Sequence, residues 1–129
     1  LYTISDIERI ADHAVNIAEA GKEMQEKNIT FSDAASKEMA QMRDVCLKVV
    51  DYLLNNQGDL IWLSEIAALE QQIDDMRRQF RRAHLERMKS GECSDEACIL
   101  YAELLTDFER IGDHALNIGQ ELTVIHEAG

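Results

Sequence analysis

The segment DIERIADHAVNIAE, residues 6–19, returns almost unchanged as DFERIGDHALNIGQ at residues 107–120. Nine of the fourteen positions are identical at an offset of 101 residues, and polar residues dominate among them. A repeat that reproduced only an amphipathic helix would keep its apolar positions and let its polar face vary. The shared aspartate, glutamate, arginine, histidine and asparagine therefore indicate that these side chains have the same task at both ends of the chain.

The residues between the two copies predict long helices. The chain contains no proline and only six glycines, and it is rich in good helix formers. Three breaks interrupt the helical pattern, at residues 27–30, 55–59 and 90–94. In these breaks Gly58 and Gly91 suit left-handed helix ends. N-caps are expected at Ser32 or Thr30, at Asp59 and at Ser94. The expected helices cover about residues 1–27, 32–56, 59–89 and 94–127.

The apolar spacing supports an all-α fold. Ile66, Leu69 and Ile73 begin a stripe at intervals of three and four residues, and no alternating β-branched run is long enough for a strand. Three short loops favour antiparallel packing of consecutive helices. The sequence therefore predicts one domain over residues 1–129, an elongated antiparallel up-down four-helix bundle.

Charge and cysteine content indicate which partners and which cellular compartment to expect for this protein. Thirteen Lys and Arg against twenty-five Asp and Glu give a net charge of −12, which argues against a nucleic-acid or anionic-membrane partner. No run is long and apolar enough to cross a membrane, so a soluble chain is expected. The three cysteines form no Cys-x-x-Cys pair, which predicts reduced thiols in the cytosol. Because the chain begins with Leu1 rather than Met, it is expected to be a fragment of a longer protein.

Three pairs of acidic residues spaced four apart are the strongest candidates for a binding site. Residues with this spacing stack on one face of a helix, where two like charges repel. A hard cation between them would remove the repulsion, and carboxylate oxygens suit Mg²⁺, Ca²⁺, Mn²⁺ or iron. Antiparallel third and fourth helices could bring two of the pairs into one four-carboxylate site. The three pairs are Glu8 with Asp12, Glu70 with Asp74, and Glu109 with Asp113.

A second interpretation is a solvated face with weak ion pairs, since Arg9, Arg110 and the arginines at 77–82 are close in sequence. His13 and His114 point away from the preceding aspartates, and are expected to be outer partners of a metal site, capping groups or packed core residues. No histidine has a glutamate three residues before it, which argues against a ferritin-type di-iron site. Phosphate loops, serine elbows and zinc-protease motifs are absent as well. The chain is therefore expected not to be an enzyme.

The two repeated segments resemble the signature of PhoU domains, and EQQID at residues 70–74 is similar to that family's second motif. The resemblance implies tandem three-helix repeats whose paired acidic motifs can hold multinuclear metal clusters. It implies one site from Glu70, Asp74, Glu109 and Asp113. Glu8 and Asp12 would belong to the equivalent site of a first repeat, of which only the last helix is present here.

The resemblance leaves the parent protein open between two kinds. The segments SDIERIADH, RAHLERM and GECS look more like the cytoplasmic tail of a sodium-dependent phosphate cotransporter than like a free PhoU regulator. The implied partner is the transporter's own membrane domain or a separate phosphate transporter, on the cytoplasmic side of the membrane. A metal-free docking module is the other alternative. Its apolar face of Ile4, Ile7, Ala11 and Ala14 needs covering, which predicts a homodimer.

Overall fold

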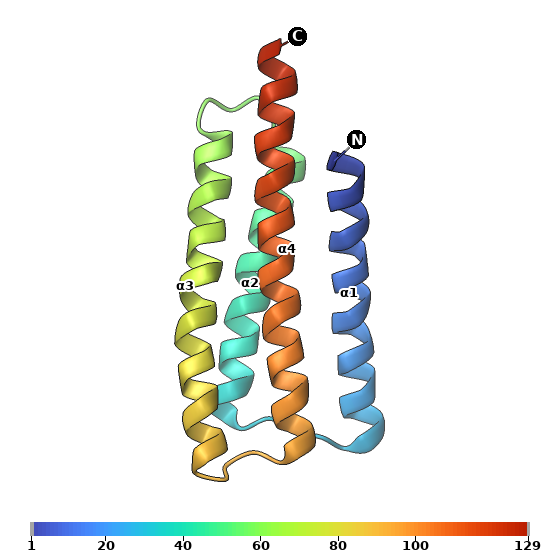
Figure 1. Ribbon diagram of the computed structural model, residues 1–129, viewed down its shortest axis with the longest axis vertical. Coiled ribbons are helices and arrows are strands. Elements are labelled where there is room, and N and C mark those ends of the chain that lie inside the picture. The colour runs from blue at the N-terminus through green and yellow to red at the C-terminus, as the bar shows by residue number, and fades with distance from the viewer. Residues whose placement is uncertain (1, 129) are drawn as a thin grey trace.

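The computed structural model describes the backbone of residues 2–128 and the side chains of residues 3–124 (Figure 1). Four long helices run up and down an elongated bundle, and residues 2–128 contain no strand. The predicted all-α four-helix fold is thereby confirmed. No described helix is both long enough and apolar enough to span a bilayer. The helices are α1 (Tyr2–Lys27), α2 (Asp33–Asn55), α3 (Trp62–Lys89) and α4 (Asp95–Ala128).

Local chemistry sets most of the helix ends where the sequence predicts them. The hydroxyl of Ser32 accepts the Ala35 N–H at 3.2 Å and begins α2. Ser94 caps α4 in the same way, with the Ala97 N–H at 3.2 Å. The turns before α3 and α4 contain glycines with positive φ, 98° at Gly58 and 73° at Gly91. A side chain at either glycine would be strained, so both turns favour glycine.

The start of α3 differs from the prediction. The helix begins at Trp62, and the residue that precedes it, Ile61, provides no side-chain cap. Asp59 does not cap the helix, because it belongs to the turn: its carbonyl accepts the Trp62 N–H at 3.1 Å. Its carboxylate accepts the Asn56 amide at 3.4 Å.

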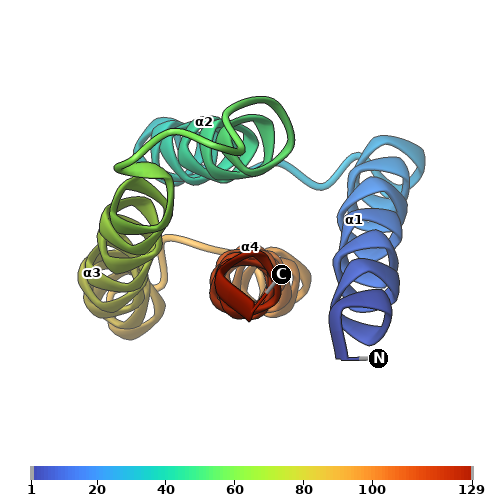
Figure 2. The ribbon, with the colours of Figure 1, turned by 90° about the horizontal axis from the view of Figure 1, so that it is seen from above.

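α4 is the central helix of the bundle and packs against all three others (Figure 2). Over the described residues, α1 contacts α4 and neither α2 nor α3. The expectation that short loops make all consecutive helices neighbours is therefore wrong for α1 and α2. The reason lies in the inward face of α1, where Ala20 is buried and Ile10, Ile17 and Met24 pack on the core. That face fits α4, and residues 28–32 bridge the gap between α1 and α2.

The apolar core lies where α2, α3 and α4 meet. Its largest fully buried side chains are Met42, Val49, Ile66, Ile73 and Tyr101. α3 and α4 approach closely, since a Cβ atom placed on Gly112 would lie 3.0 Å from Cδ1 of Ile73. The small residues of α4 therefore fix the spacing of the α3–α4 pair, on which the acidic motifs are carried.

A buried polar cluster joins the same three helices near the α3–α4 turn. Arg87 donates to both oxygens of Glu38, at 2.7 and 3.2 Å, and Tyr101 donates to Glu38 at 2.5 Å. The ring of His84 stacks on Tyr101 with centroids 4.5 Å apart. Burial lowers the pKa of His84, and the nearby Arg87 charge acts in the same direction.

The cysteine prediction is wrong for two of the three residues. Cys93 and Cys98 form a disulfide that ties the α3–α4 turn to the first turn of α4. The turn brings their Cα atoms to 6.0 Å, within the range that a disulfide needs, although the two residues form no recognised motif. Cys46 is free and buried, and burial raises the pKa of its thiol to about 12.

Candidate functional site

The two copies of the repeat meet along the α1–α4 contact, where they exchange polar side chains. Asp6 of α1 lies 2.7 Å from Nδ1 of His114, and Asp107 of α4 lies 2.8 Å from Nδ1 of His13. The aspartate of each copy thus bonds the histidine of the other copy. Asn16 adds a donor to Asp107 at 3.4 Å.

This reciprocal pairing accounts for two of the shared polar positions, the aspartate and the histidine. The rings of His13 and His114 stack at 5.9 Å between centroids and 19° between planes. Asp6, Asp107 and His114 are each less than one-tenth exposed when the whole residue, backbone included, is counted. Buried polar groups of this kind need their partners, since an orphaned one costs about 1–3 kcal/mol.

Sequence reasoning missed this interaction, although the sequence contains its signal. An aspartate and a histidine seven residues apart share one face of a helix. The same pair on two antiparallel helices predicts crosswise bonding, which is what the structure shows. His13 and His114 are thus polar residues of the helix contact and are not arranged around the acidic pairs.

The two acidic pairs of α3 and α4 lie opposite each other, as predicted. The antiparallel register puts Glu70 next to Asp113, and the pKa of Glu70 is raised to about 7. Partial burial is the first cause, followed by the hydrogen bond to Asp113 and by the charges of Asp113, Asp74 and Asp75. Glu70 therefore keeps its proton up to near-neutral pH, because partial burial and the neighbouring carboxylates disfavour its ionised form.

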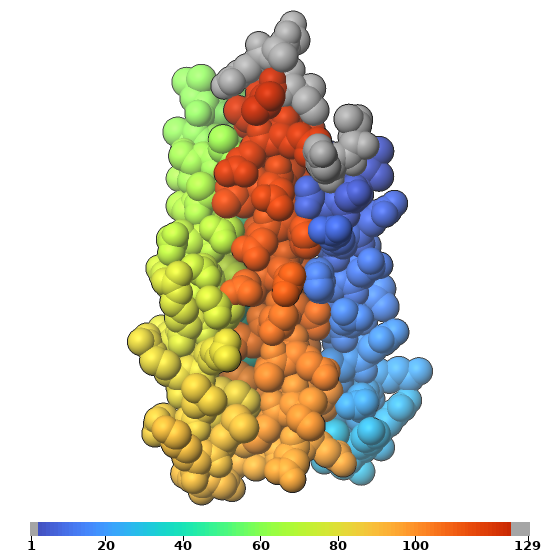
Figure 3. All heavy atoms as spheres, viewed as in Figure 1, coloured from blue at the N-terminus to red at the C-terminus, as the bar shows by residue number. Residues whose placement is uncertain are grey.

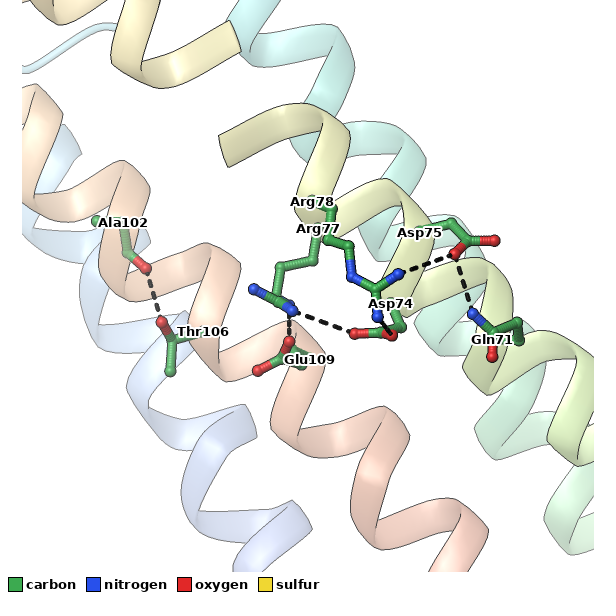
Figure 4. Close-up of polar contacts among 8 residues, drawn as sticks. All are labelled: Gln71, Asp74, Asp75, Arg77, Arg78, Ala102, Thr106 and Glu109. Atoms are coloured by element: carbon green, nitrogen blue, oxygen red, sulfur yellow. Dashed lines mark hydrogen bonds and ion pairs between the residues drawn. The ribbon is translucent and has the colours of Figure 1, made fainter. Parts of the chain in front are cut away.

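The other two acids are joined by an arginine (Figure 4). The guanidinium of Arg77 is paired with Glu109 across the helix contact and with Asp74 at 3.3 Å along its own helix. Arg78 donates to the second oxygen of Asp74 at 2.7 Å. Asp74, Glu109 and Arg77 are each about one-quarter exposed, so these pairs are only partly screened by water.

All four carboxylates thus line one α3–α4 contact, with Arg77 located where a cation would neutralise Asp74 and Glu109. In the arrangement described, no three histidine, cysteine or acidic side chains of the described residues converge as metal ligands do. The donor set is made only of oxygen and fits a hard cation. Withdrawal of the flexible Arg77 side chain would leave two acids on each helix to bind it.

Glu8 and Asp12 have different surroundings. Both are exposed on α1, and neither has a hydrogen bond or ion pair with another described residue. Since α1 contacts only α4 in the described part of the chain, no second acidic pair faces them. The structure therefore brings together four of the six predicted site residues and leaves these two apart.

The fold and its paired acidic motifs define a small helical-bundle domain with one acidic helix contact. A family model, the PhoU domain, matches residues 36–122, and the chain belongs to this family. The chain is 33% identical over 123 residues to the phosphate-specific transport system accessory protein PhoU homolog 1 of Thermotoga maritima. The match covers 94% of this chain and 52% of the relative, so the chain spans about half the relative's length. No solved structure matches the chain.

Proposed function

We propose that this chain is a non-catalytic regulatory domain of phosphate uptake that binds a hard cation through Glu70, Asp74, Glu109 and Asp113. The observation that carries the proposal is the pairing of Glu70 with Asp113 beside the Asp74–Arg77–Glu109 bridge. The printed name of the Thermotoga maritima relative, a transport-system accessory protein, supports the link to phosphate uptake.

The cation would act by rearranging one contact. It would displace the proton held by Glu70 and release Arg77 from Asp74 and Glu109. Because ligands must be deprotonated, binding would strengthen as the pH rises through about 7, the pKa of Glu70. The freed guanidinium and the neutralised acids would change the surface that the domain presents to its partner. Mg²⁺, Ca²⁺, Mn²⁺ and iron all suit these oxygen ligands.

Two settings fit this function. In one, the chain is the cytoplasmic tail of a sodium-dependent phosphate cotransporter and acts on its own membrane domain. In the other, it belongs to a free-standing PhoU regulator that acts on a separate phosphate transporter. The accessory-protein relative favours the second setting at least as well as the sequence segments favour the first.

The experiment is a phosphate-uptake assay in bacteria that lack their own PhoU-type regulator. Expression of the chain should lower the initial rate of radiolabelled phosphate uptake, and the Glu109→Gln/Asp113→Asn variant should leave the rate high at equal protein level. Glu86→Gln, an exposed position on α3, is the control and should act as the parent does. Equal uptake with and without the parent chain would contradict a regulatory role in uptake.

A second candidate function, metal-free docking, is favoured by the outer face of α1. Ile4 and Ile7 are 57% and 54% exposed, and Ala11 and Ala14 lie on the same exposed side. This face would bind a second copy or the transporter. An Ile7→Glu variant that stays folded but loses self-association in light scattering would support docking there, and an unchanged mass would count against it.

A further inference from the structure

Two grooves of opposite charge run along either side of the first half of α4. Both open on the face where α3, α4 and α1 lie side by side (Figure 3). The groove between α3 and α4 encloses about 490 Å³, and the one between α1 and α4 about 610 Å³. Ala102 and Thr106 line both grooves, so α4 forms a narrow ridge between them.

The α3–α4 groove, which we term the basic groove, contains Arg77, Arg81 and Arg110, and its one acidic residue, Glu109, is paired with Arg77. Among the described residues, neither Arg81 nor Arg110 has an acidic partner within ion-pair distance. This is unexpected in a chain with twice as many acids as bases, because most arginines could find a carboxylate nearby. The basic groove therefore offers two arginines whose charges are free for a partner.

The basic groove also exposes apolar side chains. Leu85 and Met88 on α3 are 45% and 48% exposed, and Ile99 on α4 is 60% exposed. From Arg77 to Met88 the groove follows about three helical turns, a length of about 16 Å. A surface that combines exposed apolar side chains with charged ones has the composition of a protein interface.

The α1–α4 groove, which we term the acidic groove, has the complementary charge. It is lined by Glu19, Glu23 and Glu103, and by no lysine or arginine. Glu19 and Glu103 have no basic partner among the described residues, whereas Glu23 pairs with Lys27 at 3.6 Å. Ala20 and Leu100 supply its apolar floor.

We infer that this face docks on a second copy of the chain. The two-fold axis would lie in the interface and run along the α4 ridge, past Ala102 and Thr106. A two-fold interface must be self-complementary, because each patch meets the same patch turned around. Here that rotation places the basic groove of one copy against the acidic groove of the other, on both sides of the axis. Arg81 and Arg110 of each copy then face Glu19 and Glu103 of its partner.

The small side chains of Ala102 and Thr106 allow the α4 helices of the two copies to approach each other closely, because they project little between the two grooves. The apolar side chains of Leu85, Met88 and Ile99 become covered in the same contact. This interface is separate from the outer face of α1, and it does not require a metal. Its failure would leave the proposed function untouched.

The test is a charge swap measured by sedimentation velocity over a concentration series. One variant is Arg81→Glu/Arg110→Glu, and the other is Glu19→Lys/Glu103→Lys. All four positions are exposed and carry no described ion pair, so circular dichroism should report unchanged helicity. The parent chain should sediment as a dimer and each variant alone as a monomer, because like charges then face each other.

An equimolar mixture of the two variants should restore the dimer, since every facing pair is again of opposite sign. Arg43→Glu/Lys48→Glu changes the net charge as the first variant does, but on α2, behind this face (Figure 2), and should remain dimeric. A monomeric parent at high concentration would overturn the inference. So would dimers that survive both swaps, dissociation by the α2 control, or a mixture that stays monomeric.

Discussion

The copy of the repeat in α4 is packed by α1, α2 and α3, whereas the copy in α1 contacts only α4 within the described part of the chain (Figure 2). Phe108 is 7% exposed in the core, and its counterpart Ile7 in α1 is 54% exposed. Ala115 is fully buried, whereas its counterpart Ala14 is exposed to solvent. Nearly the same fourteen residues thus serve as a core helix at one place and as a peripheral helix at the other.

The comparison separates two roles within the repeat. The aspartate and histidine positions work in both copies, because each copy supplies one half of each bonded pair at the α1–α4 contact. Among the described residues, the Glu-x-x-x-Asp positions face a second acidic pair only in α4, where α3 brings Glu70 and Asp74 close to them. The contact between the copies therefore explains the aspartate and histidine that they share, and it does not explain their shared Glu-x-x-x-Asp positions.

The largest expected difference between the copies concerns core packing. Phe108→Ala should lower the free energy of unfolding by about 3–5 kcal/mol, because it removes a buried ring and leaves a cavity. Ile7→Ala at the matching position should change it by no more than about 0.5 kcal/mol. Urea unfolding followed by circular dichroism measures both, and similar losses at the two positions would show that α1 is as enclosed as α4.

A smaller effect is expected at the α1–α4 contact. Asp6→Ala leaves the buried His114 without its partner and should cost about 1–3 kcal/mol. Asp107→Ala should cost less within that range, because the side chains of His13 and Asp107 are 22% and 13% exposed, against 11% and 10% for His114 and Asp6. Urea unfolding again provides the measurement, and a larger loss for Asp107→Ala would contradict this order.

The smallest effect is a change in the pH dependence of stability. In the folded chain Glu70 keeps its proton up to a pKa of about 7, whereas an unperturbed glutamate releases it near 4.5. The stability that Glu70 contributes is therefore complete below about pH 4.5 and is lost as the pH rises through about 7.

Glu70→Gln should flatten the unfolding free energy over that pH interval in metal-free buffer, since glutamine does not ionise. Glu8→Gln is the matched variant on α1, where no acid from another helix lies opposite, and should keep the slope of the parent. Thermal unfolding at a series of pH values would measure this. If the unfolding free energy of Glu70→Gln still fell between about pH 4.5 and 7 as in the parent, ionisable groups other than Glu70 would cause the pH dependence.

Most helix ends could be predicted from the sequence because residues close in sequence determine them. The packing partner of α1 could not, because it depends on contacts between residues far apart in sequence. Gly58, Gly91, Ser32 and Ser94 act through their own turns, so the helices and most of their ends follow from local chemistry. The position of α1 depends on complementarity with a helix about 100 residues away. A short loop suggested the wrong neighbour because loop length limits distance without choosing a partner.

The candidate site shows the same division. The spacing of the acidic pairs and the antiparallel α3–α4 arrangement predicted that the two pairs on these helices face each other across one helix contact, and a metal site made of them stays a prediction. The bridging role of Arg77 depends on the path of a long side chain, which spacing does not specify. The pairing of Cys93 with Cys98 likewise depends on how the α3–α4 turn folds.

The central claim is that, among the described residues, the α4 copy of the acidic motif faces a second acidic pair and the α1 copy does not. The most direct test is elemental analysis of the chain after loading with Mn²⁺ or Fe²⁺ and gel filtration. The parent, the α4 variant Glu109→Gln/Asp113→Asn and the α1 variant Glu8→Gln/Asp12→Asn should be compared. We expect stoichiometric metal in the parent and the α1 variant, and none in the folded α4 variant. Equal metal in all three, or none in the parent, would contradict the account.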